Sequence, residues 1–113
     1  MGRIVSTAPS HIVTRYMRGR CWEMAAELSR KTGMELWGLR GGDGLIHHAF
    51  VADPEQDLAI DIRGAMRMSE VAKGCVPGEP EPIAMPEIIR LVGVLELADL
   101  REARAAIRDH LHG

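Results

Sequence analysis

Three side chains in this sequence carry the groups that thiol-based acyl chemistry needs: a thiol, an imidazole and a carboxylate. Cys21 begins a helical pattern, and His48 and Asp61 fall on two successive segments with strand-like alternation. At a helix start, unpaired backbone N–H groups and the helix dipole lower the pKa of a thiol and favour the nucleophilic thiolate. The backbone N–H of Cys21 is itself a candidate donor to an oxyanion. The competing interpretation is a small buried hydrophobic residue on the inner face of the helix.

Two adjacent histidines compete for the role of base. His47 and His48 are neighbours on one predicted strand, so their side chains point to opposite faces of the sheet. A two-residue turn within 53–56 places residue 48 directly opposite Asp61, where Cβ atoms lie about 4.5–5.5 Å apart. A bulge at Asp57 would shift the register by one and favour His47 instead. We therefore pair His48 with Asp61, and a purely structural core histidine is the other interpretation.

The three groups meet if the helix that starts at Cys21 covers the face of the sheet that carries His48. The thiolate is then the nucleophile, the imidazole is the general base and acid, and Asp61 orients the imidazole. The sequence neighbours expected to contact the substrate are Arg20, Trp22 and His47.

The elements that position these residues follow from periodicity. Apolar residues recur every three or four positions from Cys21 to Thr32, and Gly33 sits where a left-handed C-cap is expected. A shorter helix is expected from Ser10 to Arg18. Strand-like stretches bounded by Gly- and Pro-containing turns predict an antiparallel sheet with three strands, at residues 34–39, 45–52 and 58–63.

The second half predicts a connector followed by helices. Residues 74–86 are rich in proline and glycine, and Pro86 suits the first turn of a helix over 87–92. Asp99 with Glu102 predicts a capping box for the last helix within 87–113. The apolar stripe of that helix is expected to be Leu100, Ala103, Ile107 and Leu111, and the core-filling methionines are expected to be Met66, Met68 and Met85. The predicted fold is α+β: a single domain over residues 1–113, with a Cys-bearing helix on a three-stranded antiparallel sheet and C-terminal helices.

Composition excludes several other classes. The 113 residues are 46% hydrophobic and carry a net charge of −2, which favours a globular chain without a general attraction to nucleic acid or anionic membranes. No apolar run reaches the roughly 18 residues of a membrane helix, and the N-terminus lacks the pattern of an export signal. Two cysteines, Cys21 and Cys75, are too few for a disulfide scaffold and favour the cytoplasm. No His or Cys spacing predicts a metal site, and no motif predicts a cofactor.

Charge is unevenly distributed along the chain. Residues 1–42 hold seven basic and three acidic side chains, and residues 43–113 hold seven basic and thirteen acidic ones. Arg15, Arg18 and Arg20 cluster just before Cys21. This cluster is interpreted as a solvated surface, with a site for an acidic substrate or partner as the alternative.

Short motifs resemble a known superfamily. Gly19-Arg20-Cys21-Trp22 is similar to the Gly-x-Cys-Trp motif around the nucleophile of papain-like peptidases. His48-Ala49-Phe50-Val51 resembles the His-Ala-aromatic-Val strand of transglutaminase-like proteins, and Asp61 falls where that family places its third member, on the following strand. The order of the three elements, over roughly residues 19–64, is that of the transglutaminase-like branch of the papain-like superfamily.

The resemblance implies acyl transfer from an amide, thioester or ester through a thioester on Cys21. The substrate would be a protein, a peptide or a small amide; water as acceptor gives a peptidase, amidase or deamidase, and an amine gives a transglutaminase. The chain is shorter than typical family enzymes and has no glutamine or tryptophan upstream of Cys21 to supply a second oxyanion donor. The alternative is therefore a non-catalytic binding or inhibitor protein on the same scaffold, such as a phage-type accessory factor with a protein partner.

Overall fold

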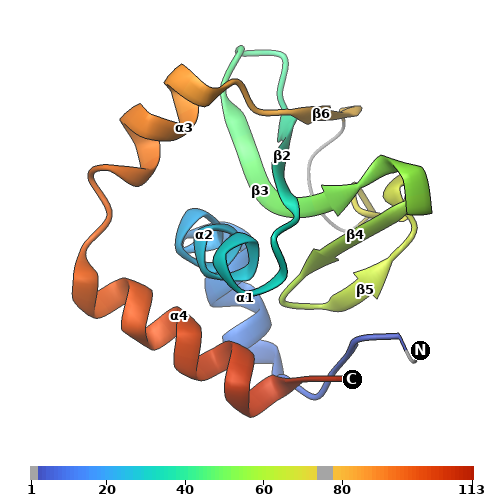
Figure 1. Cartoon of the computed structure of the whole chain (residues 1–113), viewed down its shortest axis with the longest axis vertical. Coiled ribbons are helices and arrows are strands. Elements are labelled where there is room, and N and C mark those ends of the chain that lie inside the picture. The colour runs from blue at the N-terminus through green and yellow to red at the C-terminus, as the bar shows by residue number, and fades with distance from the viewer. Residues whose placement is uncertain (1–2, 74–77) are drawn as a thin grey trace.

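The fold is α+β, and one antiparallel sheet forms its framework (Figure 1). The structure is a computed structural model that describes residues 3–73 and 78–113. Within these ranges the sheet has seven strands, not the three that were predicted, in the order β6-β2-β3-β4-β5-β1-β7. The strands are β1 (Val5–Ser6), β2 (Glu35–Arg40), β3 (Ile46–Asp53), β4 (Leu58–Asp61), β5 (Gly64–Met66), β6 (Pro80–Pro82) and β7 (Leu111–His112). The helices are α1 (Ser10–Arg18), α2 (Cys21–Thr32), α3 (Met85–Val92) and α4 (Leu97–His110).

The two N-terminal helices have the predicted bounds. α2 begins at Cys21 and ends at Thr32, and Gly33 caps it with φ 75° while its N–H bonds to the carbonyl of Ser29. Only glycine adopts this left-handed conformation without steric cost, so the sequence signal was a reliable one. α2 lies between the sheet and α4, with its apolar face toward β3 and β4 (Figure 1).

The central strands β2, β3 and β4 match the predicted ones to within one or two residues, and the remaining strands are short additions at the edges. β1 and β7 pair with each other and bring the two ends of the chain together (Figure 1). β6 lies within the segment predicted as an irregular connector and pairs with β2, with Trp37 opposite Pro82. Residues 74–77 of that connector, and with them Cys75, lie outside the described residues.

The register between β3 and β4 differs from the prediction by two residues. Ala52 pairs with Ala59 and Asp53 with Leu58, so position 48 is not directly opposite Asp61. The connection is longer than a two-residue turn because residues 54–56 form a 3-10 turn and Asp57 adopts φ 50°. A shift of two keeps every side chain on its predicted face, since the side-chain period of a strand is two.

A bulge at His47 changes the pairing of β3 with β2. Leu39 pairs with His48, but Arg40 pairs with Ile46, which leaves His47 as the extra residue. The Ile46 side chain therefore fills the space in which a Cβ of Gly38 would lie. Strict alternation predicts Ile46 on the face of His48 instead. The bulge occurs at this position and not at Asp57, where the sequence analysis had considered one.

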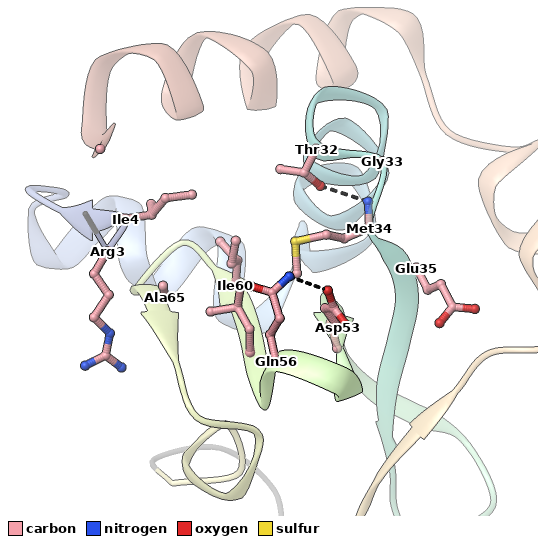
Figure 2. Close-up of a pocket in the computed structure, with 13 residues that line it drawn as sticks. Arg3, Ile4, Thr32, Gly33, Met34, Glu35, Asp53, Gln56, Ile60 and Ala65 are labelled. Atoms are coloured by element: carbon pink, nitrogen blue, oxygen red, sulfur yellow. Dashed lines mark hydrogen bonds between the residues drawn. The ribbon is translucent and has the colours of Figure 1, made fainter. Parts of the chain in front are cut away.

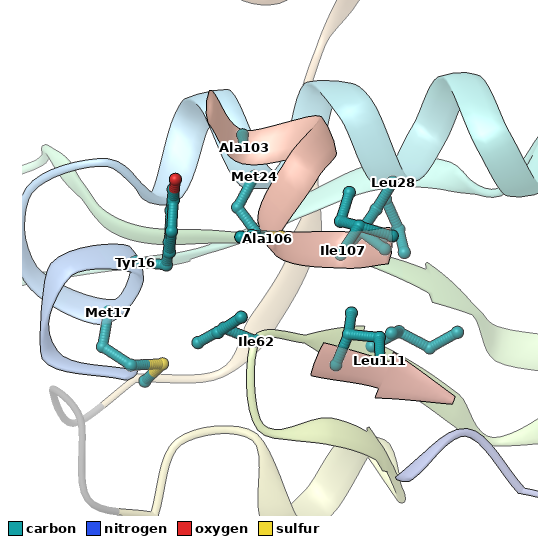
Figure 3. Packing of buried hydrophobic residues seen from close by; sticks show 11 residues of the cluster. Tyr16, Met17, Met24, Leu28, Ile62, Ala103, Ala106, Ile107 and Leu111 are labelled. Atoms are coloured by element: carbon teal, nitrogen blue, oxygen red, sulfur yellow. The ribbon is translucent and has the colours of Figure 1, made fainter. Parts of the chain in front are cut away.

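The two faces of the sheet carry separate hydrophobic clusters. One face packs against α1, α2 and α4 and includes Val51 and Ile60; Figure 3 shows the helical side chains of this cluster gathered around Ile62 and Leu111. The opposite face includes Phe50 and Ala59 and is covered by the segment around Val71. Covering on both sides agrees with the apolar material predicted on each face.

Several C-terminal predictions need correction. α4 begins at Leu97, two residues before Asp99, so Asp99 and Glu102 do not form the predicted capping box. α3 spans Met85–Val92 with a proline in its first turn, as predicted, but the Met85 side chain is 64% exposed rather than part of the core. Met66 and Met68 do pack against the second cluster. No helix within the described ranges is long and apolar enough to cross a membrane.

The C-cap of α2 gives a direct test of the fold. Gly33→Ala should lower the free energy of unfolding by about 1 kcal/mol, because alanine at φ 75° is strained although its Cβ would meet no atom within 4 Å. Gly42→Ala is the matched control, since its Cβ also has open space and its φ is not positive. Urea unfolding followed by circular dichroism measures both variants, and equal stability of the two would contradict the assigned cap.

Candidate functional site

The candidate site is built around a buried hydrogen bond between two neighbouring strands. His48 Nε2 lies 2.9 Å from Asp61 Oδ2, and the two side chains are 0% and 1% exposed. The pair is diagonal rather than directly opposed, because Asp61 is level with Phe50 and not with His48 in the observed register. The imidazole ring also stacks on Phe50, with ring centroids 5.8 Å apart. The predicted partnership is therefore present, reached through a different register.

Asp61 is held in place by the turn that follows it. Asp61 and Gly64 pair across the hairpin from β4 to β5, so Ile62 and Arg63 form its two-residue turn and the strand ends two residues earlier than predicted. The backbone N–H of Arg63 donates to Asp61 Oδ1 at 2.8 Å, which is the local bond that aspartate commonly makes at the start of a turn. The Arg63 guanidinium adds a bond from Nη2 to Oδ2 at 2.7 Å and one from Nε to Oδ1 at 3.1 Å.

This environment defines the protonation of the dyad. Burial raises the pKa of Asp61. The hydrogen bonds from His48 and Arg63 lower this pKa by a larger amount, so the net pKa lies below the usual 3.8. The carboxylate is ionised at neutral pH and accepts hydrogen bonds only, so His48 must carry its hydrogen on Nε2 when the ring is neutral. Nδ1 then holds a lone pair, and this buried atom has no hydrogen-bond partner among the described residues.

Cys21 occupies the first position of α2. The side chain is 8% exposed and packs with Ala25 and Ala49, and Trp22 and Leu36 border the same cluster. Glu23 brings a buried negative charge into the first turn, but its carboxylate is paired with Arg20 at 3.2 Å. The negative charge in the first turn of α2 is thus paired with Arg20.

The structure places Cys21 against Ala49, the neighbour of His48 in β3, but on the other face of that strand. α2 packs on the face that carries Ala49, whereas His48 stacks on Phe50 on the opposite face. The expectation that α2 covers the face of His48 is therefore wrong. His48 lies directly beside the bulge at His47, at the end of β3 nearest to the packing position of Cys21.

The residues expected to contact substrate are committed to other partners or to packing. Arg20 binds Asp99 at the start of α4 in addition to Glu23. His47 is 38% exposed, and its Nε2 lies 2.8 Å from the Asp43 carboxylate within the β2–β3 turn. The hydrogen bond from Leu45 N–H, followed by that from His47, lowers the pKa of Asp43 below its usual value. Trp22 packs beside Cys21.

Three arginines of the basic first part of the chain form ion pairs with carboxylates of the acidic second part. Arg15 pairs with Glu102, Arg20 pairs with Asp99, and Arg40 pairs with Glu81 at 2.7 Å and with Glu87 at 3.0 Å. Two arginines of the cluster before Cys21 are thus matched by carboxylates of α4. This pairing favours the structural interpretation of the cluster over a site for an acidic substrate.

A cavity of about 730 Å³ opens at the far end of α2 (Figure 2). Its lining includes the apolar side chains of Met34 and Ile60 and the charged residues Arg3, Glu35 and Asp53. The cavity begins at Thr32, eleven residues from Cys21, or about 16 Å along a helix. It contains none of the three predicted catalytic residues. Among the described residues, no group of three or more His, Cys, Asp and Glu side chains is arranged to hold a metal ion.

Arg63 is the residue of the candidate site that the sequence analysis missed. The alternation of residues 58–63 predicted a strand that includes Arg63 and assigned this arginine no role. The pattern Asp-Ile-Arg-Gly over 61–64 predicts a tight turn, because Asp favours the first position of such a turn and Gly the fourth. Such a turn folds the third residue back toward the aspartate.

Comparisons with known proteins give no further identification. A scan against protein-family models finds no matching family, and searches of curated proteins and of solved structures find no match. The resemblance to transglutaminase-like proteins therefore depends on the motifs and their order alone.

The Asp61 network predicts a specific dependence of stability on pH. Because the pKa of Asp61 is lowered on folding, its contribution is complete above about pH 5 and is lost as the pH falls through the folded-state pKa. Asp61→Asn should lower the free energy of unfolding at pH 7 by about 3 kcal/mol, since it leaves Arg63 without its carboxylate. The variant should also lose part of the acid sensitivity of the unchanged chain.

Asp43→Asn is the matched control for this measurement. It also removes a carboxylate that binds a histidine, but in an exposed pair, so the expected loss is much smaller than that of Asp61→Asn. Urea unfolding between pH 3 and pH 7 compares the variants. Equal losses in the two variants at pH 7 would show that burial of the Asp61 network does not matter.

Proposed function

We propose that this protein is a cysteine-dependent acyl-transfer enzyme in which Cys21 is the nucleophile, His48 is the general base and acid, and Asp61 orients His48. The observation that carries the proposal is the buried His48–Asp61 hydrogen bond with the Nδ1 atom of the ring left for another group. A general base needs this arrangement, in which one nitrogen is fixed by a carboxylate and the other can accept a proton.

The proposed chemistry proceeds through a thioester. Nδ1 of His48 takes the proton of the Cys21 thiol, and the sulfur attacks the carbonyl carbon of an amide, thioester or ester. The imidazolium then protonates the leaving group as the carbonyl–leaving group bond breaks. Water or an amine attacks the thioester in the second half of the cycle while His48 removes its proton; the bond between the acyl carbon and the Cys21 sulfur then breaks, and the imidazolium returns the proton to that sulfur. Backbone N–H groups at the start of α2 are the candidate oxyanion donors.

One further feature supports a reactive Cys21: the thiol stands at the N-terminus of a twelve-residue helix, where the dipole favours the thiolate. Cys21 packs against Ala49, which follows His48 in β3 and points to the opposite face of the strand. For catalysis the imidazole and the sulfur must come into contact around the end of β3, beside the bulge at His47. The substrate class in this proposal is a protein, a peptide or a small amide.

A second candidate function rests on the burial of the dyad. His48 and Asp61 are 0% and 1% exposed, and α2 covers the opposite face of β3. These observations favour a binding protein in which the dyad only stabilises the sheet and the surface contacts a protein partner. In that case His48 contributes to stability and not to the reactivity of Cys21.

Alkylation of Cys21 separates the two candidates. In a Cys75→Ser background, iodoacetamide should modify Cys21 at pH 6 far faster than an ordinary thiol, because the proposed base and the start of the helix favour the thiolate. His48→Gln should reduce this rate on the order of 100-fold, the lower end of what a positioned general base contributes. Mass spectrometry quantifies the labelled residue.

An acylation measurement completes the test. p-Nitrophenyl acetate should transfer its acetyl group to Cys21 and release p-nitrophenolate, and Cys21→Ser should abolish both. The matched control is His112→Gln, which removes an exposed imidazole at the C-terminus and should leave both rates unchanged if His48 is the base. Equal alkylation rates at pH 6 in the unchanged and His48→Gln proteins would reject catalysis and favour the binding protein.

A further inference from the structure

We infer that Arg63 is a positioning residue of the proposed site: its guanidinium fixes the Asp61 carboxylate so that the neutral His48 ring carries its hydrogen on Nε2 and presents Nδ1 as the base. This inference extends the proposed function, because it assigns a role to a residue outside the Cys-His-Asp set. Arg63 acts through Asp61 and makes no direct contact with the imidazole that would make it catalytic.

The contacts of Arg63 restrict both oxygens of the carboxylate. Nη2 bonds to Oδ2 at 2.7 Å, which is the same oxygen that His48 Nε2 approaches at 2.9 Å. The backbone N–H and Nε of Arg63 both bond to the other oxygen, Oδ1, at 2.8 and 3.1 Å. A carboxylate held at both oxygens cannot turn away from the ring without breaking several charge-assisted hydrogen bonds.

Arg63 is itself anchored on its far side. Nη1 donates to the carbonyl of Lys73 and Nη2 to the carbonyl of Val71, each at 2.7 Å. Val71 is fully buried in the second hydrophobic cluster, so the carbonyl that holds the guanidinium belongs to a packed segment. The side chain of Arg63 is only 24% exposed, which limits competition from water for these bonds. The arginine thus links the turn after β4 to the segment that covers the Phe50 face.

The chemical consequence concerns the imidazole. An ionised, immobile carboxylate beside Nε2 favours the tautomer with hydrogen on that nitrogen, and the lone pair then resides on Nδ1. A lysine at position 63 would keep the positive charge but lacks the planar fork that reaches both oxygens and two carbonyls at once. Fork geometry, and not charge alone, is therefore what the inference attributes to Arg63.

The test compares Arg63→Gln and Arg63→Lys with Arg67→Gln. Arg67 is the matched control, because it is an exposed arginine just after β5 that pairs with the aspartate just before β4, Asp57. The first readout is the ¹⁵N NMR spectrum of the His48 ring as a function of pH. The unchanged protein and Arg67→Gln should show hydrogen on Nε2, whereas Arg63→Gln should show a mixture of tautomers. Arg63→Lys should fall between them.

The second readout is the pH profile of Cys21 alkylation by iodoacetamide in the Cys75→Ser background. Arg63→Gln should lower the rate at pH 6 by about tenfold, as expected for loss of an outer partner that orients a histidine, and Arg67→Gln should leave the rate unchanged. Far-UV circular dichroism establishes that each variant is folded. If Arg63→Gln does not fold, Arg63→Lys decides the test by the same two readouts.

The outcomes separate this inference from the proposed function. An unaltered His48 tautomer and pH profile in the folded Arg63 variant would overturn the role of Arg63, whatever the reactivity of Cys21. A changed tautomer together with a Cys21 that reacts like an ordinary thiol in every variant would keep the positioning role and reject the catalytic function. A change in both readouts, confined to the Arg63 variants, supports both.

Discussion

The buried carboxylate of Asp61 is the constraint on which the candidate site depends. A negative charge at 1% exposure is stable only with opposite charge and hydrogen-bond donors around it, and Arg63 and His48 provide both. The turn, the covering segment around Val71 and the imidazole are arranged so that this one group is satisfied. Whatever the protein does, removal of any member leaves a buried polar group without its partner.

The same network gives the site its chemical asymmetry. Asp61 and Arg63 neutralise each other, so the imidazole lies beside a balanced ion pair. One ring nitrogen is engaged and the other is buried without a partner among the described residues, which is the combination that a proton-transfer group requires. Cys21 supplies a sulfur at the start of α2, against Ala49. The arrangement is consistent with acyl transfer, and its burial is equally the feature that a purely structural dyad would have.

Long-range ion pairs organise the rest of the molecule around this core. Within the part of the chain that the structure describes, three of the seven basic residues in the first 42 positions pair with acidic residues of the second half: Arg15 with Glu102, Arg20 with Asp99, and Arg40 with Glu81 and Glu87. The first two of these pairs tie α4 to the segment that leads into α2, and therefore to the position of Cys21. Part of the charge asymmetry that resembles a surface for an acidic ligand is therefore matched by ion pairs inside the folded chain.

Sequence alone determined the local parts of this protein. Periodicity and the left-handed Gly33 fixed the bounds of α2, including its start at Cys21. Alternation placed His48 and Asp61 on one face of the sheet, and this prediction holds because the register error was two residues. Tertiary structure decided which face α2 covers, the bulge at His47, the two-residue edge strands and the contacts of Arg63. Side-chain period fixes faces within a strand, but the choice of face for a helix, and the partners of a charge, depend on packing among segments far apart in the chain.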